Sequence, residues 1–185
     1  MARIPLKFPR LFNVLNFFHT FTFQSHPMNH DIVLDKMRRY CAYRERSHKE
    51  VRYKLVELKV YGMDLERIMT QLIEEDFLNE LRYAKAYVSG KFRMNKWGRN
   101  KILRGLKHQD ISSYCVKKAM EEIDEVEYNA VLYQLLEKKI RQYSKDDDYI
   151  KRNKLIKYAL SRGYNMNEMM PHISALIDKD QAINR

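Results

Sequence analysis

The chain has 185 residues, of which 45% are hydrophobic, with few glycines and prolines and a formal net charge of +11. This length suits one or two ordinary domains or a short array of small repeats, and the scarcity of glycine and proline favours helices over a turn-rich β fold. The sequence contains no run of about eighteen apolar residues, so we expect no membrane-spanning helix.

Residues 1–27 are set apart by their composition. Arg3, Lys7 and Arg10 precede the run LFNVLNFFHTFTF, and no acid occurs in this stretch. The arrangement is weakly similar to a secretory signal peptide, but polar residues interrupt the apolar run and no small-x-small cleavage motif follows it. We therefore expect residues 1–30 to form a disordered N-terminal extension outside the fold, with a signal peptide as the alternative.

Three helices are expected over residues 31–75. Apolar residues recur at spacings of three and four from Asp31 onwards, which predicts an amphipathic helix. Ser47, followed three residues later by Glu50, is the capping-box pattern, in which each side chain binds the other residue's free backbone N–H. A second helix should therefore begin after Ser47. Gly62 suits a helix end, and Met63 and the aspartate after it open a third helix.

The same six-residue pattern occurs three times, at residues 63–68, 111–116 and 164–169. Each copy has a large apolar residue, then a capping residue, then a second large apolar residue at the end, which is the spacing of a hydrophobic staple. In the third copy, Asn165 and Glu168 also form a capping-box pair. A period of about 50 residues is typical of a repeat array. The sequence thus predicts an all-α fold: an elongated tandem array of three three-helix, helix-turn-helix-like repeats at 31–75, 76–124 and 125–177, with a frayed tail at 178–185.

Positive charge is concentrated in the central repeat. Residues 82–109 contain nine Lys and Arg residues and no Asp or Glu, whereas the other residues after residue 27 are together close to neutral. A local cationic patch predicts an acidic partner, and Lys and Arg bind phosphates with a salt-sensitive, sequence-independent affinity. Trp97 or Phe92 would add base stacking if exposed, but a core position is the more usual one for either aromatic.

Catalysis is not indicated. The sequence has no glycine-rich phosphate loop, no HExxH and no Gly-x-Ser-x-Gly motif, and its six histidines are scattered. Cys41 and Cys115 lack metal-ligand spacing, so we expect buried free thiols in a reducing compartment. The helix expected at 112–123 carries Glu121 and Glu122 rather than the Arg, Asn and Gln residues that read base edges, so sequence-specific DNA recognition is not expected.

The run FLNELRYA at residues 77–84, followed by Trp97-Gly98, Lys101-Ile102, Leu106 and Ile111, resembles the central motif of the RecX family of bacterial regulatory proteins. The likeness covers residues 31–177. It implies a cytoplasmic regulator of DNA repair, DNA recombination and the SOS response. Proteins of this family bind in the helical groove of the RecA–DNA filament and modulate, usually by inhibition, the recombinase, ATPase and co-protease activities of RecA.

Resemblance and charge together define the expected site. We expect a monomer that is not an enzyme, binds the RecA filament and also contacts DNA, with no cofactor, metal or small-molecule substrate. A standalone, sequence-nonspecific nucleic-acid-binding protein is the alternative.

The glycine common in the family before the second staple is Asp110 here, which predicts a different turn. The residues expected to bind the filament or nucleic acid are Arg82, Lys91, Arg93, Lys96, Trp97, Arg99, Lys101, Arg104 and Lys107.

Overall fold

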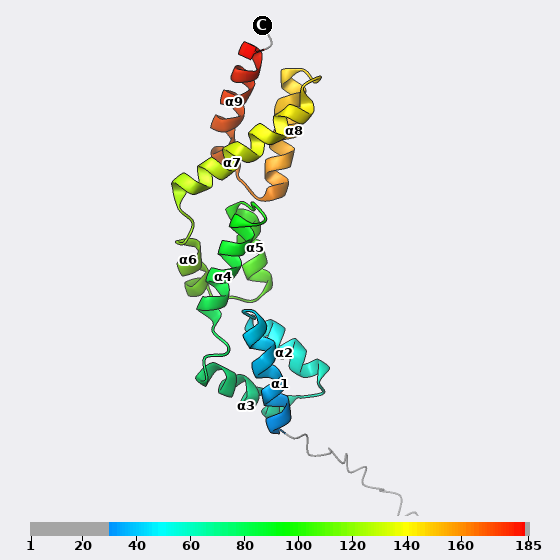
Figure 1. The fold of residues 1–185 in the computed structure, drawn as a ribbon, viewed down its shortest axis with the longest axis vertical. Helices are drawn as coiled ribbons and strands as arrows, with labels where there is room; N and C mark the ends of the chain where they lie inside the picture. The colour runs from blue at the N-terminus through cyan, green and yellow to red at the C-terminus, as the bar shows by residue number, and fades with distance from the viewer. Residues whose placement is uncertain (1–29, 184–185) are drawn as a thin grey trace, which may run out of the picture.

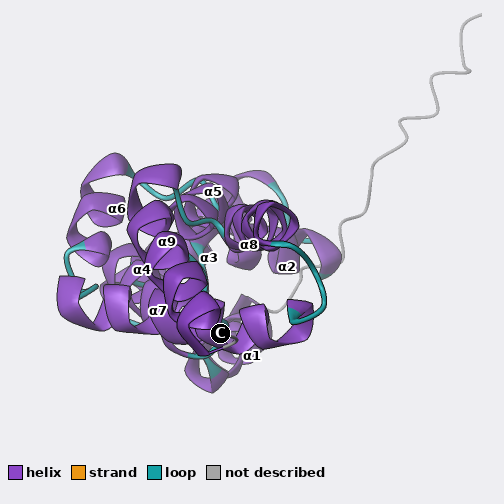
Figure 2. Cartoon of the chain, turned by 90° about the horizontal axis from the view of Figure 1, so that it is seen from above, coloured by secondary structure: helices purple, strands orange, loops and turns teal. Residues whose placement is uncertain are grey.

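The computed structural model describes residues 30–183, so residues 1–29 of the expected extension lie outside the described residues, while His30 is already the first residue of a helix. Within the described range the chain forms α-helices, one short 3-10 helix and no strand (Figure 2). The helices are α1 (His30–Tyr43), α2 (His48–Glu57), α3 (Gly62–Glu74), α4 (Glu80–Arg93), α5 (Arg99–His108), α6 (Ser113–Met120), α7 (Glu125–Ile140), η1 (Arg141–Tyr143), α8 (Asp148–Arg162) and α9 (Met166–Ile183).

Three sets of three helices follow one another along the long axis of the molecule (Figure 1). The first repeat is α1–α3, the second is α4–α6 and the third is α7–α9, with η1 inserted after α7. This arrangement confirms the predicted all-α tandem array of three-helix repeats. The expected boundaries, 75/76 and 124/125, fall between helices of successive repeats, while the independence of each repeat as a domain stays a prediction.

Helices α2 and α9 begin with the capping boxes that the sequence predicts. The Ser47 hydroxyl accepts from the backbone N–H of Glu50, and the Glu50 carboxylate accepts from the backbone N–H of Ser47, both at 3.0 Å. Asn165 and Glu168 repeat this pair of bonds at 2.9 Å. A capping side chain of this kind stabilises a helix by about 1 kcal/mol, because it satisfies a backbone donor that has no partner within the helix.

The hydrophobic staple of the first repeat begins at Val60, so the prediction of a staple at Met63 is wrong. Met63 lies inside α3 and is 81% exposed, whereas Val60 is fully buried two residues before α3. Ile111 and Tyr164 hold the equivalent buried positions before α6 and α9. The misplacement has a local cause: no residue of a capping type stands directly before α3, and Asp64 is the first one after its start.

Asp110 follows α5 in the left-handed backbone conformation, with a φ of 56°. Its N–H donates to the carbonyl of Lys107 at 3.0 Å, and the next N–H donates to the carbonyl of Leu106 at 3.2 Å. These are the paired bonds of a Schellman motif, and Gly163 occupies the same place after α8 with a φ of 94°. The expected difference in the turn is therefore wrong, because Asp is one of the few non-glycine residues that tolerate this region.

The last helix continues beyond the expected end of the third repeat. Lys151 on α8 forms a 2.6 Å ion pair with Asp180, and Lys179 lies 3.1 Å from the carboxylate of Glu137 on α7. These contacts hold the final turns of α9 against its neighbours. The prediction of a frayed tail is therefore wrong for residues 178–183.

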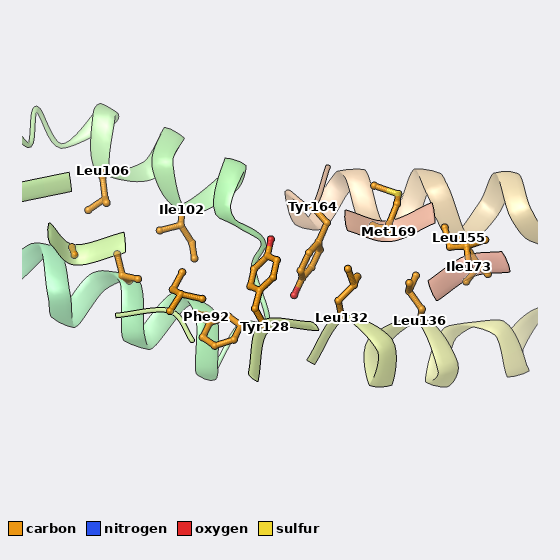
Figure 3. Packing of buried hydrophobic residues seen from close by; sticks show 14 of the residues in the cluster. Phe92, Ile102, Leu106, Tyr128, Leu132, Leu136, Leu155, Tyr164, Met169 and Ile173 are labelled. Atoms are coloured by element: carbon orange, nitrogen blue, oxygen red, sulfur yellow. The ribbon is translucent and has the colours of Figure 1, made fainter. Parts of the chain in front are cut away.

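Buried apolar side chains form two clusters. The first fills the space between α1, α2 and α3 and includes Leu78 from the turn before α4. The second continues from α4 through α9 (Figure 3). Phe92, Tyr128 and Tyr164 lie across the boundary between the second and third repeats, with successive ring centroids 5.8 and 5.2 Å apart. The second and third repeats thus share one core, since no polar layer separates their buried residues.

Backbone contact between Gly98 and Gly163 brings the start of α5 beside the end of α8. The N–H of Gly98 donates to the carbonyl of Arg162 at 2.9 Å, and the N–H of Asn100 donates to the carbonyl of Gly163 at 3.1 Å. A methyl group at Gly98 would lie 2.5 Å from the backbone atoms of Gly163 and Tyr164, closer than side-chain carbons approach in proteins. Only glycine permits the two chain segments to approach this closely.

The first and second repeats are joined by ion pairs as well as by Leu78. The Lys49 ammonium lies 2.9 Å from the Asp110 carboxylate, and Arg82 Nε lies 2.6 Å from the Glu45 carboxylate. All four of these side chains are partly solvent-exposed, with relative exposures from 26% to 71%. This junction is therefore more polar than the shared core between the second and third repeats.

Replacing Gly98 by alanine tests the glycine contact. Gly98→Ala is expected to lower the free energy of unfolding by about 1–3 kcal/mol, the usual cost of an overpacked site, because the chain at Gly163 must move away. Gly90→Ala is the matched control: open space surrounds Gly90 inside α4, so alanine should stabilise the helix by about 0.5–1 kcal/mol. Urea denaturation followed by circular dichroism measures both changes. Equal effects of the two substitutions would contradict the role given to the contact.

Candidate nucleic-acid interface

Basic residues of the central repeat gather where α4 ends and α5 begins. Lys96 adopts a left-handed conformation with a φ of 54°, and the N–H of Trp97 donates back to the carbonyl of Lys91 at 3.1 Å. The chain therefore turns sharply after α4, and Trp97 lies beside the last turn of that helix. Gly98 is the N-cap residue of α5, so α5 leaves this turn directly.

The indole ring of Trp97 contacts two ammonium groups. It is half-buried and packs against the shared core. Lys91 Nζ from α4 lies 4.9 Å from the ring centroid and Lys101 Nζ from α5 lies 4.6 Å from it, both within the range of a cation–π interaction. Phe92 is only 2% exposed, so base stacking on Phe92 is excluded.

Arg162 joins these residues from the third repeat, and sequence analysis did not identify it. Its guanidinium donates to the carbonyl of Asn95 at 3.1 Å, and the Lys101 ammonium donates to the carbonyl of Ser161 at 3.1 Å. The Gly98–Gly163 contact brings these groups together, and no local pattern in the sequence signals that contact. We define the cationic strip as Lys91, Lys96, Lys101, Arg104 and Arg162.

Two members of the strip are fully available to a partner. Lys96 and Arg104 are exposed, and neither forms an ion pair with any residue in the range 30–183. Arg104 borders a shallow hollow of about 460 Å³ that also includes Leu160 and Gly163 at the end of α8. Arg93 is exposed as well, but its side chain lies 3.6 Å from the Glu127 carboxylate.

Arg82 lies apart from the strip, at the junction with the first repeat. It pairs with Glu45 there, and its Nη1 is 2.8 Å from the Asp76 carboxylate. Lys85, on the next turn, pairs with Glu122 at 2.6 Å, and the hydrogen bond from Lys85 holds the pKa of the Glu122 carboxyl below its usual value. The acids that neutralise these cations come from outside residues 82–109, which is why the local charge count did not reveal them.

Arg99 connects the second and third repeats instead of facing solvent. Its Nη2 lies 2.7 Å from the Glu125 carboxylate, and its guanidinium lies 4.0 Å from the centroid of the Tyr128 ring. The backbone N–H of Arg99 also donates to the Tyr128 hydroxyl at 3.1 Å, and that hydroxyl donates to Glu168 at 3.0 Å. Burial raises the pKa of Tyr128, so the hydroxyl stays protonated as this bond requires.

Lys107 lies one turn after Arg104 on α5, and with Leu103 and residues of helix α6 it lines a separate groove. It is exposed and forms no ion pair with a described residue. The nine residues expected from the sequence therefore divide into a cluster around Trp97, two structural arginines, and Lys107 on its own surface. Their role in binding stays a prediction.

Metal sites, membrane-spanning helices and reactive thiols are the other features that residues 30–183 could provide. No group of three or more His, Cys, Asp or Glu side chains in this range is placed to hold a metal ion. No helix in the described part is both long enough and apolar enough to cross a bilayer. Cys41 and Cys115 are buried free thiols, as expected, and burial raises the pKa of Cys41 to about 11 and that of Cys115 above its usual value.

Architecture and surface together define a basic, tandem three-helix repeat protein. Two family descriptions match the chain: RecX, second three-helix domain, over residues 79–120, and RecX, third three-helix domain, over residues 125–169. The regulatory protein RecX of Clostridium perfringens strain SM101 is 33% identical over 122 residues, covering 65% of this chain and 57% of the relative. That of Clostridium acetobutylicum is 30% identical over 128 residues, covering 67% and 59%.

Solved structures agree with these sequence matches. The crystal structure of RecX from Lactobacillus salivarius superposes with a TM-score of 0.70 at 24% identity, covering 83% of this chain and 97% of that one. A second structure, of regulatory protein RecX, gives a TM-score of 0.69 at 18% identity, covering 75% and 68%. The chain belongs to the RecX family. It spans less than two thirds of the length of the curated relatives just described.

The structural role of Arg99 can be separated from a binding role by stability measurements. Arg99→Gln is expected to cost about 1–3 kcal/mol of unfolding free energy, because the carboxylate of Glu125 and the face of Tyr128 lose their cation. Arg104→Gln, on the same helix but without an ion pair, should stay within about 0.5 kcal/mol of the parent protein. Chemical denaturation measures the difference, and similar values for the two variants would argue against the assignment.

Proposed function

We propose that this protein acts in the cytoplasm as a monomer that binds the RecA–DNA filament and inhibits its recombinase, ATPase and co-protease activities. Membership of a family of regulatory proteins supports a regulatory role. The observation that carries the proposal is the cationic strip, which lies on the second and third repeats of an elongated body (Figure 1). A long body with cations on one region suits a polyanionic groove.

Phosphate binding by the strip follows from the chemistry of its side chains. Lys and Arg that neutralise phosphates release condensed counterions, which favours binding without regard to base sequence. Lys91 and Lys101 both lie against the ring of Trp97, so part of the entropic cost of ordering their side chains is met before binding. Because the same ring packs on the core and carries both lysines, we assign Trp97 the role of positioning cations rather than stacking bases.

Inhibition would follow from occupation of the groove. Six helices share one core, so we expect the second and third repeats to keep their relative position when they bind. A body of this kind, seated against the phosphates, would exclude a second DNA strand and resist the rearrangement of filament subunits. Binding across several subunits would also make the effect depend on an assembled filament.

A standalone nucleic-acid-binding protein is the second candidate. Lys96 and Arg104 can neutralise phosphates on bare DNA as well as in a filament, and nothing in their geometry requires a protein partner. The two functions differ in what the parent protein prefers. A regulator should bind RecA–DNA filaments at least about tenfold more tightly than single-stranded DNA at physiological salt, whereas a standalone binder should show no such preference.

Charge reversal at the strip tests the proposed function. Lys96→Glu with Arg104→Glu is expected to weaken filament binding by about tenfold or more and to reduce inhibition of RecA ATP hydrolysis on single-stranded DNA. Loss of two phosphate contacts should also reduce the slope of log affinity against log salt by about 1.4. Anisotropy titrations over a salt series and a coupled ATPase assay measure these effects.

Lys138→Glu with Lys157→Glu is the matched control. Both lysines are exposed on α7 and α8 and form no ion pair with a described residue, so the pair changes net charge equally while leaving the strip intact. The control should bind nearly as the parent protein does. If both double variants lose the same affinity, the effect belongs to overall charge and the strip has no special role.

A further inference from the structure

A second surface of the central repeat has a composition unlike that of the strip. It is an open groove of about 1030 Å³ formed by α5, α6 and the turn that leads into α7. Its floor is apolar, with Leu103 from α5, Val116 and Met120 from α6, and Ile111 and Ile123 from the turns on either side of α6. Leu103 is 38% exposed, so the groove presents apolar surface that the described part of the chain leaves uncovered.

The acids around this groove are already neutralised. Asp110 pairs with Lys49 at 2.9 Å, Glu121 pairs with Lys118 at 3.1 Å, and Glu125 pairs with Arg99.

Two cations on the groove are not neutralised. Lys107 and Lys117 are exposed, and neither pairs with any described residue. The groove therefore offers an apolar floor together with two ammonium groups that have no counterion among residues 30–183.

We propose that this groove binds an acidic amphipathic helix of a partner protein. The apolar side of such a helix would cover Leu103, Val116 and Met120, and its carboxylates would pair with Lys107 and Lys117. Helix-in-groove binding uses apolar anchors at spacings of three, four and seven residues, and an open apolar groove is the surface that this mode requires. The surface is distinct from the strip, so the inference goes beyond the proposed function and does not depend on DNA binding.

Charge excludes other occupants. Residues 1–29 contain Arg3, Lys7 and Arg10 and no acid, so this segment has no group to pair with Lys107 and Lys117. A second copy of the chain carries the same net charge of +11 and would be repelled. Nucleic acid would satisfy the two lysines but would leave the apolar floor uncovered. An acidic helix satisfies the charges and the floor together.

The inference can be tested with a synthetic peptide. The probe is a fluorescein-labelled helix of about 16 residues, with leucines at the helix-in-groove spacings and glutamates elsewhere, and the comparison peptide replaces every glutamate by lysine. The full-length protein should bind the acidic probe at least about tenfold more tightly than the basic one, as expected when opposite charges meet across an interface. Equal binding of the two peptides would overturn the proposal.

Variants assign the binding to the groove. Lys107→Glu with Lys117→Glu, and separately Leu103→Asp, should each weaken probe binding by about tenfold or more, since each removes a determinant at the centre of the contact. The controls are Lys138→Glu with Lys157→Glu, and Ile150→Asp, which replaces an apolar residue of 40% exposure elsewhere. The lysine variant keeps the apolar surface, so it decides the question even if Leu103→Asp perturbs folding. Probe binding that survives both groove variants would place the site elsewhere.

Further measurements separate the groove from the other surfaces. The single variant Lys96→Glu should keep its affinity for the acidic probe, because Lys96 is not a residue of the groove. Loss of filament binding in that variant therefore concerns the strip alone. Failure of the probe to bind a protein that still inhibits RecA would overturn the groove and leave the proposed function standing. Concentration-dependent dimers that Leu103→Asp abolishes, or displacement of the probe by an oligonucleotide at the groove, would assign the surface to self-association or DNA instead.

Discussion

The backbone contact between Gly98 and Gly163 is the constraint on which the six-helix body depends. It sets how closely α5 approaches the end of α8, and two hydrogen bonds fix that approach. Phe92, Tyr128 and Tyr164 fill the space beside it, so the core passes from one repeat to the next without a break. The contact also brings cations of the second and third repeats together, so the strip forms only where these two repeats meet.

Local patterns were sufficient to predict the helices, the two capping boxes and the array of three repeats. These features depend on residues three to five positions apart, and the backbone donors at a helix start accept only a few side-chain partners. The prediction of a staple at Met63 was wrong because α3 starts without a capping side chain, so the sequence carried no local signal for its first residue. The prediction of a frayed tail was wrong for a different reason. Lys151 and Asp180 are distant in sequence, and their ion pair could not be inferred from either segment alone.

Charge counting located the basic part of the chain but overestimated the number of cations without an ion-pair partner. Residues 82–109 contain no acid, yet Arg82 and Arg99 are neutralised by Glu45 and Glu125 from other segments. Charge counting also omitted Arg162, which belongs to the strip although it lies more than fifty residues farther along the chain. The groove was missed because its floor is made of residues that any helical pattern assigns to a core. The expectation of a RecA filament as partner came from the family resemblance, because the spacing of residues does not identify a particular partner protein.

The two junctions of the array differ in their sensitivity to salt, because ion pairs contribute to the junction between the first and second repeats. The contacts of Lys49 with Asp110 and of Arg82 with Glu45 are partly solvated, so dissolved salt screens them, whereas the apolar core farther along is insensitive to screening. Cations condense around a polyelectrolyte such as DNA, so the solution next to the proposed partner would be locally concentrated in electrolyte. The orientation of the first repeat relative to the second should therefore change with local salt concentration. The arrangement of the second and third repeats should not.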